Sequence, residues 1–70
     1  MTFLLLDVVT LVEDISEEGL QAGKVGAVVE VFDKPPQAYL VEFCDSMGTT
    51  VKLLPLSSEQ LQPANGAKIY

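Results

Sequence analysis

The chain has 70 residues and a net charge of −6, and 49% of its residues are hydrophobic. This length suits one small domain, and the hydrophobic fraction is large enough for a core and argues against disorder. The sequence holds four lysines, no arginine and no histidine, which argues against a basic nucleic-acid surface, a histidine general base and an imidazole metal site.

Residues 1–7 form an apolar segment that contains Phe3 to Leu6. No basic stretch precedes these residues, so the segment does not resemble a signal peptide. The longest apolar run has four residues, whereas a membrane-spanning helix needs about 20, and we therefore expect no membrane association. Two interpretations stay open: the segment covers an open end of the domain, or it forms a protein–protein contact, since exposed apolar patches mark interfaces.

The alternation of residues 8–12 predicts the first strand, and apolar side chains on both of its sides indicate that both are covered. A long loop follows over residues 15–23, in which Ile15 and Leu20 are expected to fold back onto the core. The carboxylates around this loop lack the ligand order of an EF-hand, so we expect no metal site. We expect a solvated acidic surface that docks a basic partner, formed by Glu13, Asp14, Glu17 and Glu18.

The domain is organised around residues 19–32, where a glycine-rich turn leads into a strand over residues 25–32. Alternation assigns one set of side chains to the core face: Val25, Ala27, Val29 and Val31. The opposite face, which Glu30 places next to water, carries Gly26, Val28, Glu30 and Phe32. A glycine inside a strand predicts a bulge, a bend or a close backbone approach. Val28 and Phe32 on the water-facing side predict contact with a neighbouring loop or with a partner.

The two prolines within residues 33–37 indicate a connector, because proline cannot donate a ladder hydrogen bond. Residues 38–44 predict the third strand, whose core face carries Tyr39, Val41 and Phe43. Cys44 has no histidine to activate it, so we interpret it as a structural thiol. A single cysteine excludes an internal disulfide and suits the cytoplasm.

Residues 45–48 predict a hairpin turn. We expect a fourth strand over residues 49–54, with Val51 and Leu53 facing the core, and we expect Pro55 to end it.

Residues 57–61 start with serine and continue with glutamate and glutamine, which predicts one 3₁₀ or α-helical turn. Gln62 and Pro63 form a last short strand or simply close the domain. Residues 64–70 form a tail in which Tyr70 folds back.

Together these elements predict an all-β fold: a five-stranded SH3-like barrel with one helical turn before the last strand. The long loop follows the first strand, where SH3 folds carry their longest loop. Closure into a barrel protects strand edges in so small a domain. Residues 1–70 contain no linker or internal repeat, so we expect a single domain.

The chain resembles a family of short bacterial proteins that has no established activity. The shared pattern L-x-D-V-V-x-L-x-E-D appears here from Leu5 to Asp14. Further matching blocks run over Glu17 to Val31, Ala38 to Gly48 and Glu59 to Pro63. The resemblance covers nearly the whole chain and implies an SH3-like barrel, but it implies no activity.

A second resemblance concerns residues 23–31, Gly-Lys-Val-Gly-Ala-Val-Val-Glu-Val. Their Gly-x-Val-Gly-x-Val core is similar to the KOW motif of ribosomal and transcription-elongation proteins. Families that use this motif on RNA are usually basic, whereas this chain is acidic, so the similarity supports the fold more than RNA binding.

These observations predict a small non-catalytic protein-interaction or accessory-subunit module without a cofactor, located in the cytoplasm. The alternative is a KOW-like nucleic-acid or ribosome-associated module, against which the dispersed lysines argue. The expected partner is a protein with a basic surface, and a homodimer is a further arrangement to test. The candidate partner-binding residues are Glu13, Asp14, Glu17, Glu18, Val28 and Phe32. The sequence predicts no catalytic or metal-binding residue, and it does not identify the partner or the biological process.

Overall fold

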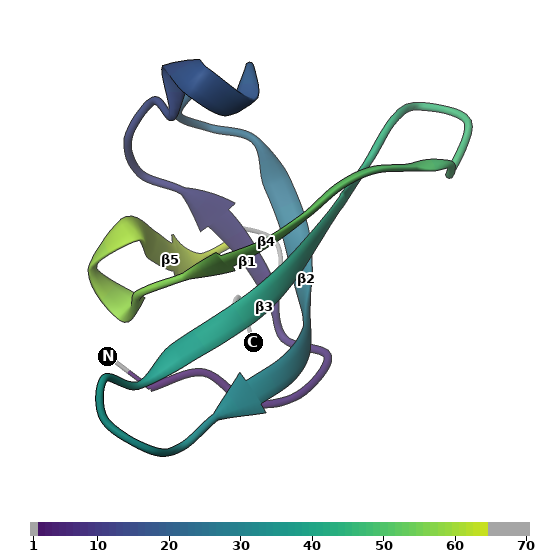
Figure 1. Cartoon of the computed structure of the whole chain (residues 1–70). Coiled ribbons are helices and arrows are strands. Elements are labelled where there is room, and N and C mark those ends of the chain that lie inside the picture. Colours follow the sequence, from purple (N-terminus) through teal and green to yellow (C-terminus); the bar gives the residue numbers. More distant parts are fainter. Residues whose placement is uncertain (1, 65–70) are drawn as a thin grey trace.

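Five strands form one antiparallel sheet in the order β4-β3-β2-β1-β5 (Figure 1). The computed structural model describes residues 2–64. The strands are β1 Val8–Leu11, β2 Val25–Phe32, β3 Ala38–Cys44, β4 Thr50–Leu56 and β5 Leu61–Pro63, and the 3₁₀ turns are η1 Ser16–Glu18 and η2 Ser58–Gln60. The predicted all-β fold, with five strands and a helical turn before the last one, is confirmed. The predicted tail lies outside the described residues from residue 65 onward, Tyr70 included.

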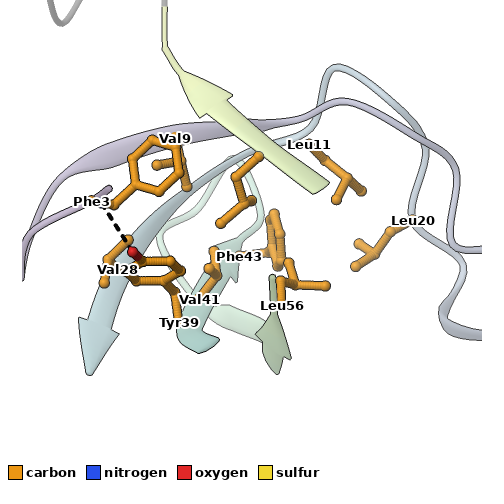
Figure 2. Packing of buried hydrophobic residues seen from close by; sticks show 10 residues of the cluster. Phe3, Val9, Leu11, Leu20, Val28, Tyr39, Val41, Phe43 and Leu56 are labelled. Atoms are coloured by element: carbon orange, nitrogen blue, oxygen red, sulfur yellow. Dashed lines mark hydrogen bonds between the residues drawn. The ribbon is translucent and has the colours of Figure 1, made fainter. Parts of the chain in front are cut away.

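The core lies on the inner side of the sheet and draws side chains from all five strands (Figure 2). Its most deeply buried members are Tyr39, Phe43, Leu11, Val9, Val28 and Val41. Phe3 joins them from the N-terminal segment, with its ring edge-on to Tyr39 at a centroid distance of 5.4 Å. The backbone N–H of Phe3 donates to the Tyr39 hydroxyl at 3.3 Å, so the core holds Phe3 by both packing and a hydrogen bond.

The predicted core face of β2 is wrong in its first half. Val28 is fully buried and Val25 is half exposed, the reverse of the expected pattern. The pairing with β3 explains the change of face, because Val28 lies opposite Val41 whereas Glu30 lies opposite Leu40. Val29 is therefore the extra residue of a β-bulge. Since a one-residue insertion exchanges the two faces of a strand, the even positions point inward before the bulge and Val31 packs on the core after it.

The predicted orientation of β4 is also wrong, and Pro55 does not end the strand. Leu54 and Leu56 pack on the core, while Leu53 is exposed. Leu54 pairs with Val41, which faces inward, so the even positions of β4 share the inward direction. Val51 is skipped where Phe43 pairs with Lys52 and Cys44 pairs with Thr50, a second bulge.

Pro55 is tolerated inside β4 because, within residues 2–64, β4 is an edge strand that pairs only with β3. The other edge strand, β5, has only three residues and contains Pro63. Proline supplies no N–H to an added strand, so both free edges of the sheet are protected against further pairing.

The loop between β1 and β2 folds back as predicted. Ile15 and Leu20 form an isolated antiparallel bridge, Leu20 is buried, and Ile15 packs against the core. The short helical turn η1 lies between them, where the sequence predicts only a loop. The residues Ile15 to Leu20 thus form a compact, internally bonded unit rather than a free loop.

The N-terminal segment has a buried part, as expected if it covers the domain, and an exposed part, as expected for a protein–protein contact. Phe3 belongs to the core, whereas Leu4, Leu5 and Leu6 are exposed on a tight turn. The N–H of Asp7 donates to the Leu4 carbonyl at 3.0 Å, and the Asp7 carboxylate accepts from the Leu4 N–H at 2.8 Å. The N–H of Leu6 donates to the Val28 carbonyl at 2.6 Å, which holds this turn against β2.

Candidate functional site

We call the β1–β2 connection, which carries Glu13, Asp14, Glu17 and Glu18, the acidic loop. It forms one wall of an open groove of about 680 Å³, and β4 forms part of the other. We call it the acidic groove; its lining is Asp14, Ser16, Glu18, Gly19, Leu20, Gln21, Lys24, Val51 and Lys52. Lys52 reaches across from β4, and its Nζ lies 3.1 Å from Oε1 of Glu18. The groove therefore combines carboxylates with two lysines and is not purely acidic.

Three of the four predicted carboxylates make contacts within the chain. Glu18 pairs with Lys52. Oδ1 of Asp14 accepts a hydrogen bond from the Ala22 N–H at 2.8 Å, and Oε2 of Glu13 accepts one from Nε2 of Gln60 at 3.2 Å. These contacts help to hold the loop. Within residues 2–64, no three acidic or cysteine side chains come together as a metal site.

The two apolar members of the predicted site lie elsewhere. Val28 is fully buried in the core, so it cannot touch a partner and its assignment to a surface is wrong. Phe32 is partly exposed at the end of β2, whereas the acidic loop precedes the start of β2. Eight residues of extended strand separate the two by about 20 Å or more, so the structure does not bring Phe32 together with the carboxylates.

A second surface, which the sequence does not predict, is the side of the sheet that faces away from the core. We call it the outer sheet face: the side chains of β1–β4 that point away from the core. One cross-strand row of it runs through Val8, Ala27, Glu42 and Leu53, and the next row runs through Glu30, Leu40 and Pro55. Its apolar members reach solvent to a large extent: Val8 is 43% exposed, Val25 50%, Phe32 39% and Leu53 53%.

The sequence of β3 nevertheless contains a signal for this surface, because the strand carries apolar side chains on its outward side as well as on its inward side. Leu40 and Cys44 alternate with the inward-facing Tyr39, Val41 and Phe43 and are half-buried on the opposite side. A strand that is apolar on both sides indicates that both sides are covered or that one side is available for docking. Glu42 lies between Leu40 and Cys44 and accepts a hydrogen bond from the Thr50 hydroxyl, which orients this carboxylate on the outer face.

The basic side chains do not gather into a patch within residues 2–64. Lys24 and Lys52 line the acidic groove, and Lys34 lies in the exposed connection between β2 and β3. The fourth lysine, Lys68, lies outside this part of the chain. Cys44 is a free, half-buried thiol on β3.

Comparison with sequence families matches residues 5–63 to a domain of unknown function, DUF4926. The chain belongs to the DUF4926 family. The match spans β1 to β5, so the whole sheet is the DUF4926 domain. The searches of curated proteins and of solved structures found no match. No helix in the described DUF4926 domain is long and apolar enough to cross a membrane.

Proposed function

We propose that this DUF4926 protein is a small non-catalytic module that binds another protein, as an interaction domain or an accessory subunit. The observation that carries this proposal is the outer sheet face, where several large apolar side chains are exposed on a rigid surface. Contiguous exposed apolar patches mark protein–protein interaction sites, and on this face Leu40 lies opposite Pro55, which is two residues from Leu53 on β4. The residues that bear them are anchored by the core on the other side of the same strands.

The module is proposed to be an SH3-like barrel. The strand order β4-β3-β2-β1-β5 and the 3₁₀ turn directly before β5 support this assignment. The long loop after β1, with its η1 turn, has the place of the longest loop of SH3 folds.

The partner is proposed to be a protein with a basic surface, met in the cytoplasm. The net charge of −6 steers the domain towards basic partners, and the exposed carboxylates of Glu13, Asp14 and Glu17 add to this preference. Nucleic acid is the weaker alternative, because Lys24 and Lys52 lie among the carboxylates of the acidic groove and Lys52 is already paired with Glu18.

Affinity capture from the native lysate with matched variants tests this function. Val25→Thr/Leu53→Thr makes the outer sheet face more polar while keeping side chains that favour strands. Met47→Thr is the control, since Met47 is 85% exposed on the β3–β4 turn and lies off this face. We expect one protein to be retained at moderate salt by the parent and by the control and to be lost from the double variant. Equal recovery by all three, or recovery of nucleic acid alone, contradicts the proposal.

A further inference from the structure

We propose that the outer sheet face binds an amphipathic helix of the partner protein, whose apolar stripe covers Leu40 and Leu53 and whose lysines or arginines pair with Glu30 and Glu42. This inference rests on the proposed function and specifies the partner for the same surface. It follows from the arrangement of apolar and charged side chains, from the signs of the charges and from the state of the sheet edges.

The apolar part of the face suits one helix in size. Val8, Ala27 and Leu53 stand in one row across four neighbouring strands, with Glu42 between Ala27 and Leu53. Four strands span about 14 Å at the usual spacing, and a helix with its side chains is about 10–12 Å wide. A single helix is therefore too narrow for the whole row, but it covers two or three neighbouring strands, such as β3 and β4, which carry Leu40 and Leu53.

The charged part of the outer sheet face consists of Glu30 and Glu42, which favour a partner with positively charged side chains. Glu30 lies opposite Leu40 across the β2–β3 pair, and Glu42 lies two residues from Leu40 on the same side of β3. Leu40 thus has a carboxylate on either side. None of the lysines in the described part of the chain stands at an outward position of β1–β4: Lys24 and Lys52 line the acidic groove and Lys34 lies in the β2–β3 connection. A partner that covers Leu40 must neutralise both glutamates, since carboxylates that lose their water without a counter-charge are strongly destabilising.

This charge pattern disfavours a second copy of the chain as the occupant. Two outer faces placed together would bring Glu30 and Glu42 of one copy against the same carboxylates of the other. No lysine of the described outer face is available to compensate them, and each chain carries a net charge of −6. The face therefore fits a partner of the opposite charge better than it fits itself.

The sheet edges indicate a helix rather than an added strand. Strand addition requires a free edge with a regular row of backbone donors and acceptors. The β4 edge is interrupted by Pro55 and by the bulge at Val51, and the β5 edge is three residues long and contains Pro63. Because neither edge suits strand addition, we expect the partner to contact the side chains of the outer sheet face. A helix makes contacts of this kind.

The test uses a synthetic helical peptide of about 18 residues, built from leucine and lysine, with leucines at positions i, i+3, i+4 and i+7. Binding to the isotope-labelled full chain is followed by amide chemical shifts, and affinity by fluorescence anisotropy of the labelled peptide. One control peptide has the same composition without an apolar stripe, and another replaces lysine with glutamate. We expect the largest shifts at the outer sheet face and weak binding of both controls.

Matched variants separate the face from general electrostatic attraction. Glu30→Gln/Glu42→Gln removes two charges from the outer sheet face, and Glu13→Gln/Glu17→Gln removes two from the acidic loop. We expect the first pair to weaken binding about tenfold and the second by less than about threefold, because nearby charges dominate at physiological salt. Leu53→Thr is expected to weaken binding about tenfold, since it removes most of one buried leucine contact.

Several results would overturn the inference. These are equal losses in the two double variants, chemical shifts centred on the acidic loop, equal binding of the peptide without a stripe, or dimerisation of the free chain that Leu53→Thr abolishes. If the lysate partner depends on Val25 and Leu53 but the leucine–lysine peptide does not bind, the interaction function stands and the basic helix is wrong. If the peptide binds as expected but no lysate protein is retained, the proposed function fails separately.

Discussion

At the scale of single residues, Gly26 shows how closely β2 and β3 approach on the inner side of the sheet. A Cβ atom on Gly26 would lie 2.8 Å from the Glu42 carbonyl oxygen, 2.8 Å from Cγ1 of Val41 and 2.9 Å from Cδ1 of Phe43. The glycine is needed here for space, and its φ is not in the left-handed region. Of the three alternatives that the sequence left open, a close approach is the one that holds.

We expect Gly26→Ala to destabilise the domain by about 2–3 kcal/mol, because the added methyl group overpacks the core against the backbone of β3. The control is Gly19→Ala, where nothing lies within 4 Å and φ is +71°, so only a backbone cost of about 1 kcal/mol is expected. Urea denaturation followed by circular dichroism measures both. A Gly26→Ala variant no less stable than Gly19→Ala would contradict the steric explanation.

At the scale of elements, the acidic loop is held by both an apolar and an ionic contact. Leu20 is buried against the core, and its bridge with Ile15 closes the η1 turn. The Lys52–Glu18 pair joins the same loop to β4, but the two side chains remain 40% and 32% exposed. Solvent-exposed ion pairs contribute little to stability, so the apolar contact should dominate.

Leu20→Ala is expected to lower the free energy of unfolding by about 2–3 kcal/mol through the lost burial and the cavity it leaves. Lys52→Ala is expected to change it by less than about 1 kcal/mol. Denaturant titrations of the two variants side by side decide which contact matters more. The reverse order of costs would mean that the ion pair, rather than the apolar contact, fixes the loop.

At the scale of the whole molecule, two regions within residues 2–64 each carry several exposed apolar side chains. The outer sheet face is one, and the turn of Leu4, Leu5 and Leu6 is the other. In both regions exposed side chains sit on backbone that is fixed by hydrogen bonds or by the core on the opposite side. The N-terminal turn thus contributes Phe3 to stability and its leucines to the surface.

We expect Leu4→Ser/Leu6→Ser to leave the chain folded and monomeric, with the free energy of unfolding changed by less than about 1 kcal/mol. The physical reason is that Leu4 is 68% exposed and Leu6 71% exposed, so little buried area is lost. Thermal unfolding and sedimentation velocity measure stability and mass. A parent that dimerises and a variant that does not would identify this turn as a self-association surface, and an unfolded variant would show that the leucines belong to the core.

The sequence alone predicted the strand number, the inward side of β3 with Tyr39, Val41 and Phe43, the loop pinned by Ile15 and Leu20, and the turn before β5. The turn is held as its sequence indicates, since Oε1 of Gln60 accepts from the Ser57 N–H at 2.9 Å. These features depend on capping residues and on a clear alternation of apolar and polar side chains. Both can be recognised from residues that are close together in the sequence. The acidic residues of the candidate site were also identified as surface residues for this reason.

Only the tertiary structure decided which faces of β2 and β4 point inward. The strand β2 is apolar on both sides, so its alternation fits either face, and the bulge at Val29 reverses the inward phase within the strand. The phase of β4 is set by the pairing of Leu54 with Val41, which joins residues distant in the chain. For this reason the sequence pattern predicts Val28 as a surface residue and Val25 and Leu53 as core residues, and all three predictions are wrong. A one-residue bulge cannot be recognised in a sequence that is apolar on both sides. It nevertheless exchanges the two faces of the strand, and so decides which side chains enter the core and which lie on the candidate docking surface.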